Sequence, residues 1–165
     1  MKKKGNTMSV TVPNRAPSPA EFLNQAGIID RLVVSLHRKR YYEDVRDTII
    51  RSMYDLSSAM ISALVRANDL YAVEQNNAGA NRLITLPMIQ ERFQLFNEAK
   101  GYLAALSQKA TELYIVKPVK HRYRGTKKDL AVALQKEYKL LKGLCDTERD
   151  RLRKYAKEAD GVPEE

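Results

Sequence analysis

Residues 49–70, IIRSMYDLSSAMISALVRANDL, contain the most regular hydrophobic pattern in this sequence. Apolar side chains recur there at alternating intervals of four and three residues, which is the spacing of one face of an α-helix. The pattern predicts a long amphipathic helix that begins near Glu43. Its core-facing residues are Ile49, Met53, Leu56, Met60, Ala63, Ala67 and Leu70.

A shorter helix is predicted before this one. Ser18-Pro19-Ala20-Glu21 is typical of a helix start, because the serine can cap the helix, the proline suits the first turn and the glutamate can bond back to the cap. The apolar face that follows at helical spacing consists of Phe22, Ala26, Ile29, Val33 and Leu36. The pattern ends in the basic segment 37–42.

A third helix is predicted after the turn-forming residues 75–81. Thr85 can cap it and Pro87 then falls within its first turn. Gly101 lies in the middle of this helix, where glycine weakens helical structure and can let a neighbouring backbone come close. The apolar face consists of Ile89, Phe93, Phe96, Ala99, Leu103, Leu106, Ala110 and Leu113.

A fourth helix is predicted after the basic segment 117–128. Thr126-Lys127-Lys128-Asp129 resembles a capping box, with aspartate in place of the preferred glutamate. Most residues on the outer surface of this helix are cationic. The predicted core face consists of Leu130, Leu134, Tyr138, Leu141, Leu144, Cys145 and Leu152.

Four amphipathic helices predict an all-α fold, namely an antiparallel up-down-up-down four-helix bundle over residues 18–158. Residues 1–17 hold three consecutive lysines and two prolines, which favours a flexible basic N-terminal arm. Residues 159–165 form an acidic tail. With one cysteine, no secretory signal and no apolar run of roughly 18 residues, we expect a cytoplasmic protein outside the membrane.

The sequence contains no pattern typical of an enzyme. Phosphate-binding glycine loops, nucleophile elbows and zinc-protease motifs do not occur. His37 and His121 lie in basic segments with no carboxylate three residues earlier, so they do not match the ligands of a di-metal bundle. Cys145 lies on a predicted core face, where a thiol behaves as a small apolar group. We therefore expect a non-enzymatic protein with no metal and no cofactor.

The net charge of +9 favours a phosphate-rich partner. In an up-down-up-down bundle the first and third interhelix connectors lie at the same end, so their basic clusters would form one patch. Tyr41, Tyr42 and Tyr123 could stack on unpaired bases or cap the end of the core. The predicted nucleic-acid-binding residues are Arg38, Lys39, Arg40, Lys117, Lys120, Arg122, Tyr123, Arg124, Lys127 and Lys128.

Three segments resemble the accessory variability determinant proteins of diversity-generating retroelements, which are similar to proteins encoded in intervening sequences of bacterial 23S ribosomal RNA genes. The segments are residues 42–51, Ala63-Leu64-Val65-Arg66-Ala67-Asn68, and residues 92–99. The resemblance implies a four-helix bundle that assembles as a pentamer, partners a reverse transcriptase in mutagenic retrohoming, and binds template RNA or an RNA–DNA hybrid. The N-terminal arm and the segment 117–128 depart from the family pattern.

A different class of function also fits the charge pattern. The same basic connectors would suit a structural or adaptor helical-bundle protein that binds an acidic surface on a protein partner. Binding to structured RNA at low salt separates the two hypotheses, because only the first requires it.

Overall fold

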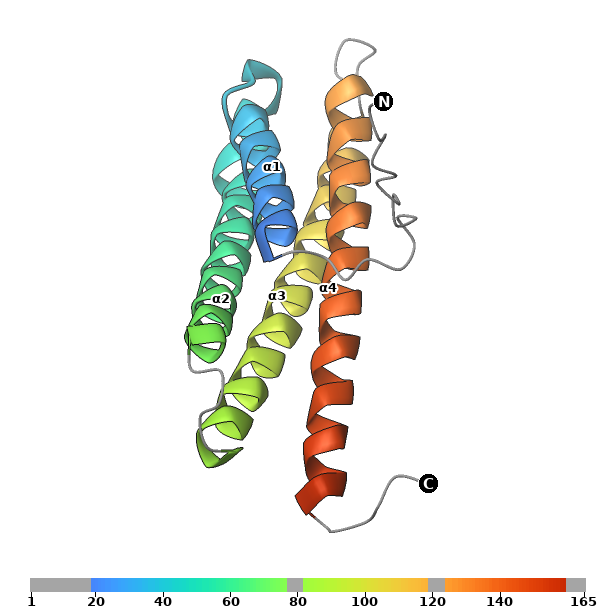
Figure 1. Ribbon diagram of the computed structural model, residues 1–165. Helices are drawn as coiled ribbons and strands as arrows, with labels where there is room; N and C mark the ends of the chain where they lie inside the picture. The colour runs from blue at the N-terminus through green and yellow to red at the C-terminus, as the bar shows by residue number, and fades with distance from the viewer. Residues whose placement is uncertain (1–18, 77–81, 119–123, 160–165) are drawn as a thin grey trace, which may run out of the picture.

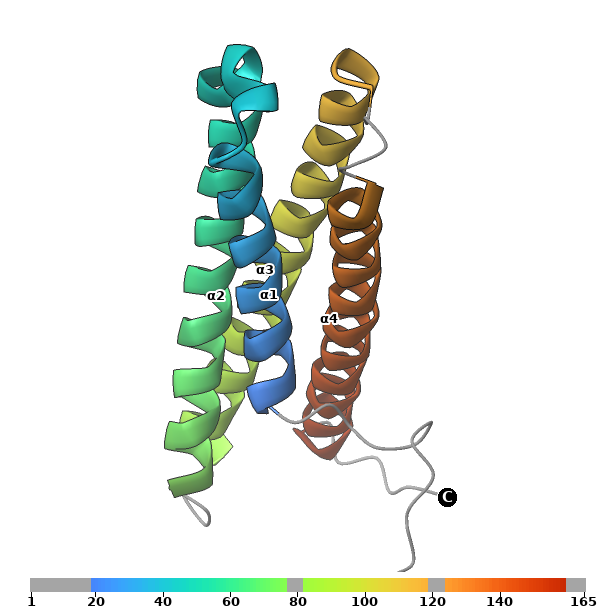
Figure 2. The same ribbon diagram turned by 90° about the horizontal axis from the view of Figure 1, so that it is seen from above.

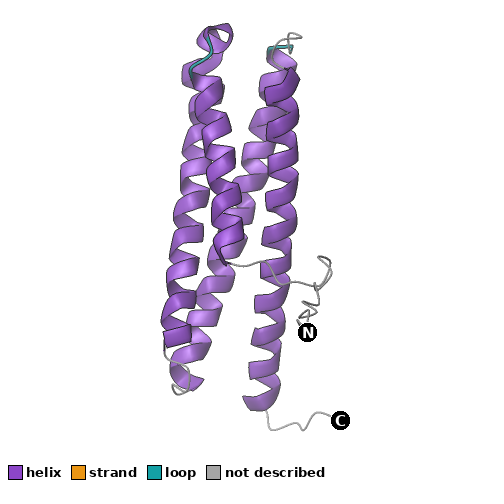
Figure 3. Cartoon of the chain, turned by 45° about the horizontal axis from the view of Figure 1, so that its top comes forward, coloured by secondary structure: helices purple, strands orange, loops and turns teal. Residues whose placement is uncertain are grey.

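The computed structural model describes residues 19–76, 82–118 and 124–159. Its long helices are α1 (Pro19–His37), α2 (Arg51–Asn76), α3 (Arg82–Val116) and α4 (Arg124–Ala159). These residues contain no strand (Figure 3), so the all-α prediction is confirmed. The predicted basic arm and, apart from Ala159, the predicted acidic tail lie outside the described residues. Within the described ranges, no helix has the length and apolar character needed to cross a membrane.

The helices pack in chain order around a common core. α1 contacts α2 and α4, and α3 contacts α2 and α4 on the other side. Figures 1 and 2 show α1 between α2 and α4. α1 has 19 residues and α3 has 35, so at about 1.5 Å per residue α3 is longer by roughly 24 Å. α3 and α4 therefore extend past the start of α1, as Figure 1 shows.

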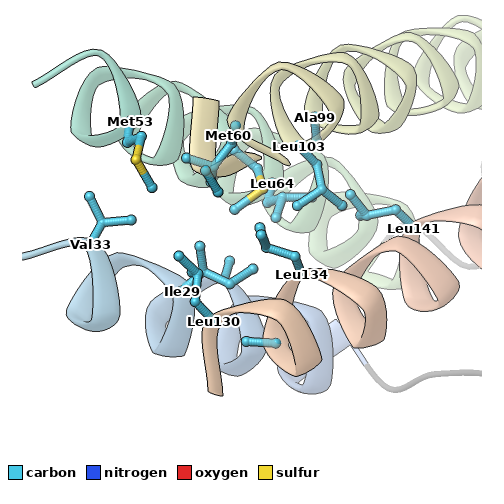
Figure 4. Close-up of a cluster of buried hydrophobic side chains, with 14 of the residues drawn as sticks. Ile29, Val33, Met53, Met60, Leu64, Ala99, Leu103, Leu130, Leu134 and Leu141 are labelled. Atoms are coloured by element: carbon cyan, nitrogen blue, oxygen red, sulfur yellow. The ribbon is translucent and has the colours of Figure 1, made fainter. Parts of the chain in front are cut away.

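Side chains from all four helices meet in one core (Figure 4). The ring of Phe22 on α1 packs edge-on against Phe96 on α3, with the ring centres 5.7 Å apart. Gln25 is also buried, and its side-chain amide donates a hydrogen bond of 3.1 Å to the Ala133 carbonyl of α4. The predicted apolar face of α1 is confirmed, because all five of its residues are buried: Phe22, Ala26, Ile29, Val33 and Leu36.

The other three helices each bury a polar residue that lies next to a predicted core residue. On α2, Ser57 is buried and Leu56 is half-buried. On α3, Arg92 is buried and Phe93 is half-buried. On α4 the difference is larger, because Glu137 is 0% exposed while the predicted core residue Tyr138 is 49% exposed. The remaining predicted core residues of α4 are buried or half-buried.

Two helices begin earlier than predicted. α3 starts at Arg82 and α4 at Arg124, so Thr85 and Thr126 lie inside helices, and Thr126 does not cap α4. The Thr126 hydroxyl instead accepts a hydrogen bond from the Lys39 ammonium at 2.6 Å. The predicted cap Ser18 lies outside the described residues.

The start of the second predicted helix is irregular. A 3₁₀ turn, η2 (Arg40–Val45), and a π-helical turn, η3 (Arg46–Ile50), precede α2. Tyr42 departs from helical geometry with φ −105° and ψ 15°, which marks the kink between connector and helix. Gly101 is exposed, and apart from its chain neighbours and the nearby backbone of α3, no atom lies within 4 Å of the position that a Cβ would occupy. The expectation of a close backbone approach there is therefore wrong.

Candidate nucleic-acid interface

The connector between α1 and α2 lies against the end of α3 and the start of α4. The Lys39 ammonium bonds to the Thr126 hydroxyl, and the Tyr41 hydroxyl donates to the Pro118 carbonyl at 2.7 Å. The Lys117 ammonium also forms an ion pair with the Asp44 carboxylate. The two residues in each contact are at least 73 positions apart in the sequence, and the ion pair between Asp44 and Lys117 has the shortest separation. In Figure 1 the turn between α1 and α2, the end of α3 and the start of α4 lie at the same end of the molecule.

We call the cationic side chains at this end the basic pole. Of its members, Arg38, Arg40, Arg124, Lys127 and Lys128 are exposed, whereas the other two are half-buried. The predicted residues Lys120, Arg122 and Tyr123 lie outside the described residues. The described members of the basic pole are Arg38, Lys39, Arg40, Lys117, Arg124, Lys127 and Lys128.

Lys39 and Lys117 hold the two connectors together. Partial burial lowers the pKa of the Lys39 ammonium from its ordinary value, and this group lies on the Thr126 hydroxyl. Lys117 lies 5.6 Å from the centre of the Tyr41 ring in addition to its ion pair. Its hydrogen bond to Asp44 lowers the pKa of that carboxyl. These two lysines therefore make contacts between the connectors, whereas the other five cations of the pole are exposed.

The pole is not uniformly positive. Glu43, Asp44 and Asp47 are exposed on η2 and η3, beside the first basic connector. Lys117 pairs with Asp44 and compensates its charge. The cations on α4 belong to a different element from these three acids. At the start of α4 the three cations Arg124, Lys127 and Lys128 are accompanied by one acid, Asp129, so the excess of positive charge is expected there.

The first turn of α4 combines two sources of positive potential. It contains Arg124 and Lys127 and no acidic residue. The N-terminus of a helix also carries a partial positive charge from its unbonded N–H groups. Cations at this position repel that charge, and a bound anion would relieve the repulsion. The start of α4 is therefore suited to a phosphate group.

The predicted stacking role of Tyr42 is wrong, since its side chain is only 1% exposed. Tyr41 is half-buried and packs edge-on against Tyr42, with ring centres 5.0 Å apart and an angle of 68° between the rings. Its hydroxyl is bonded to Pro118. The two tyrosines therefore cap the end of the core, which is the alternative role that the sequence left open.

A groove on the outer side of α3 and α4 begins at the pole. It has a volume of about 420 Å³, and Tyr114, Lys127, Leu134 and Tyr138 are among its lining residues. A second hollow of about 570 Å³ shares Tyr114 and Lys127 with it and adds Arg124 and Lys128. The Lys127 ammonium lies 5.0 Å from the centre of the Tyr114 ring. The groove thus has an apolar floor and a cationic rim.

Sequence reasoning did not identify this groove. Tyr114 lies one position beyond the last predicted core residue of α3, and Tyr138 was itself predicted to be core. The available signal was the pair Lys127 and Lys128 near the start of α4, which lie eleven and ten positions before Tyr138 on the same helix.

The remaining chemically notable side chains do not form a reactive site. Cys145 is 1% exposed, its thiol lies 3.8 Å from the Asn97 side-chain oxygen, and burial raises its pKa. A raised pKa keeps the thiol protonated and reduces its nucleophilicity. His37 is exposed at the end of α1. Within the described ranges, no three His, Cys, Asp or Glu side chains gather as metal ligands would.

Comparison of the chain with protein-family models, curated proteins and solved structures gives no match.

Proposed function

We propose that this chain is a non-enzymatic nucleic-acid-binding protein, built as an antiparallel up-down-up-down four-helix bundle, whose basic pole binds the phosphate backbone of RNA or of an RNA–DNA hybrid. The observation that carries the proposal is the contact between the two connectors. Lys39 and Thr126, 87 positions apart, bring the cations of both connectors to one surface. A group of exposed cations on a rigid scaffold suits a polyanion, which offers phosphates at regular intervals.

The pole favours sequence-tolerant binding. Its exposed members are arginines and lysines outside any base-reading motif, so we expect them to contact mainly phosphates, which carry no sequence information. Their contact with RNA releases counterions, so affinity should fall steeply with salt. In this role the two half-buried lysines of the pole set the geometry and the five exposed cations supply the charge.

The biological setting that we propose follows the resemblance to accessory variability determinant proteins. In that setting the chain forms a homo-oligomer, a pentamer by resemblance, and acts with a reverse transcriptase and its template RNA in mutagenic retrohoming. The exposed apolar side chains Val65, Ile115 and Val132 on three helices are consistent with contacts between copies. Light scattering measures the oligomeric state, and co-purification with a reverse transcriptase tests the partnership.

The binding proposal is tested by fluorescence anisotropy with a labelled, structured RNA at about 50 mM and about 200 mM salt. We expect binding at the lower concentration and a loss of affinity of about tenfold or more at the higher one, because each phosphate contact adds to the salt dependence. Absence of RNA binding at low salt would overturn the proposal. Binding to an acidic protein but not to RNA would favour an adaptor function.

A further inference from the structure

The groove between α3 and α4 differs from the rest of the pole in its chemistry. Its lining includes Ala110, Leu130, Leu134 and two tyrosines, so most of the floor is apolar. Its volume of about 420 Å³ falls within the range of sites that bind small molecules. The exposed cations Arg124, Lys127 and Lys128 lie at the pole end of the groove. A ligand that fits both parts needs a flat apolar body joined to an anion.

Tyr138 is the accessible aromatic side chain of this groove. It is 49% exposed, whereas Tyr114 is half-buried and has the Lys127 ammonium over its ring. Along α4, Lys127 and Tyr138 are eleven positions apart, and three turns of helix bring them to the same side. Side chains on a helix lean toward its N-terminus, so Tyr138 leans toward the cationic end.

From this arrangement we infer that the groove binds one unpaired nucleobase of a single-stranded segment, stacked on Tyr138, while Arg124, Lys127 and Lys128, about 15–21 Å along α4, hold phosphates of the nucleotides that follow on the same strand. Aromatic stacking beside a cationic track is the usual way in which proteins bind single strands without reading their sequence. A duplex cannot use the groove, because its bases are paired and stacked on each other. This inference rests on the proposed function and specifies which part of a nucleic acid the pole prefers.

The test compares a short single-stranded RNA carrying one 2-aminopurine with a blunt RNA duplex that contains the same strand. The full chain should bind the single strand more tightly than the duplex, and the 2-aminopurine emission should fall as the base stacks. Tyr138→Ala should weaken single-strand binding by about tenfold and leave duplex binding unchanged. Tyr138→Phe, which keeps the ring, should behave as the parent protein.

Tyr54 provides a matched control. It lies on α2, outside the groove, and is 46% exposed, close to the value for Tyr138. Tyr54→Ala should therefore change neither affinity nor the 2-aminopurine signal. Circular dichroism of all three variants checks that helix content is preserved.

The outcomes distinguish this inference from the proposed function. If Tyr138→Ala binds the single strand as tightly as the parent protein does, the groove assignment is overturned while salt-dependent RNA binding stands. If the parent protein binds neither the single strand nor the duplex, both are overturned. If a poly-glutamate peptide binds in place of the oligonucleotide and Tyr138→Ala weakens that binding, the groove takes an acidic protein segment and the inference is again wrong.

Discussion

At the pole end of α4, Arg124, Lys127 and Lys128 are exposed, whereas toward the other end Glu148 is buried and lies 2.7 Å from the buried guanidinium of Arg92. Both regions carry charged side chains where α4 lies beside α3, but those at the pole are exposed to solvent and those of the ion pair are buried. A buried ion pair is costly to break, because the remaining partner is left as a buried charge. Exposed charge contributes little to stability and can contact a partner. Substitutions at the buried ion pair should therefore change stability, whereas substitutions at the pole should change the binding of a partner.

Glu137, between these regions on the same helix, shows a third arrangement. It is 0% exposed, and neither carboxyl oxygen has a hydrogen-bond partner. Burial raises the pKa of this carboxyl from 4.5 to about 8, while the nearby Lys136 acts in the opposite direction. The side chain is thus protonated in the folded protein at neutral pH. α4 therefore places acidic side chains in the core both with a cationic partner, at Glu148, and without one, at Glu137.

The largest effect is expected at the buried pair. Glu148→Ala leaves the Arg92 guanidinium buried without this carboxylate, so the free energy of unfolding should fall by about 3–5 kcal/mol in urea denaturation. The double variant Arg92→Met with Glu148→Leu removes both charges, so its free energy of unfolding should fall by less than that of the single variant. A single variant as stable as the parent protein would show that the pair is not buried in solution.

A smaller effect of opposite sign is expected at Glu137. The unfolded state loses its proton near pH 4.5 and the folded state near pH 8, so the folded protein binds more protons between these values. Its free energy of unfolding should therefore fall as pH rises through this window, by an amount on the order of 3 kcal/mol from this residue. Glu137→Leu should be more stable than the parent protein at pH 8.

Urea denaturation of the parent protein and Glu137→Leu at pH 5 and pH 8 measures this contribution. All other titrating groups are the same in the two proteins, so the difference in their pH dependence comes from Glu137. Glu137→Gln, which keeps a polar group but cannot ionise, is the matched control and should show the same reduced dependence on pH. Equal pH dependence in the parent protein and both variants would mean that Glu137 is solvated.

The hydrogen bond between the connectors should contribute less. Tyr41→Phe removes the hydroxyl that donates to the Pro118 carbonyl and keeps the ring that packs on Tyr42. We expect a loss of about 1 kcal/mol in the free energy of unfolding, which is typical of one hydrogen bond. Thermal unfolding measures it, with Tyr54→Phe on the exposed face of α2 as the control. A loss for Tyr41→Phe no larger than that for Tyr54→Phe would contradict the contact with Pro118.

The smallest effect on stability is expected at the pole. Arg124 and Lys128 are exposed, so reversing both charges should lower the free energy of unfolding by no more than about 0.5 kcal/mol, and glutamates at the N-terminus of α4 favour the helix. The same urea titration measures this change. A destabilisation comparable to that of Glu148→Ala would show that the pole contributes to the core.

Helical spacing predicted the fold class and all five apolar core positions of α1, although it did not identify the buried Gln25 beside Ala26. It did not distinguish neighbouring positions on the other helices. Intervals of three and of four both continue a helical face, so the pattern allowed Leu56 or Ser57, and Tyr138 or Glu137. The apolar residue was the natural choice in each case. The structure buries the polar neighbour instead, because side-chain partners and helix rotation determine which of the two points inward.

The candidate site was predictable in part for a similar reason. Charge density identified the five exposed cations of the pole, since clusters of like charge remain at the surface. The positioning role of Lys39 and Lys117 depends on Thr126 and Asp44 in distant elements, and no local pattern contains those partners. The groove depends on how α3 and α4 pack, so its two tyrosines could not be assigned from either helix alone.

The salt dependence of RNA binding tests the central claim most directly. The double variant Arg124→Glu with Lys128→Glu changes the charge of the pole, and Lys139→Glu with Lys142→Glu makes the same charge change farther along the exposed face of α4. The slope of log K against log salt should become shallower in the pole variant by about 0.7–0.9 for each phosphate that the protein no longer neutralises. The control variant should keep the slope of the parent protein. Equal slopes in all three proteins would contradict the assignment of the basic pole as the nucleic-acid-binding surface.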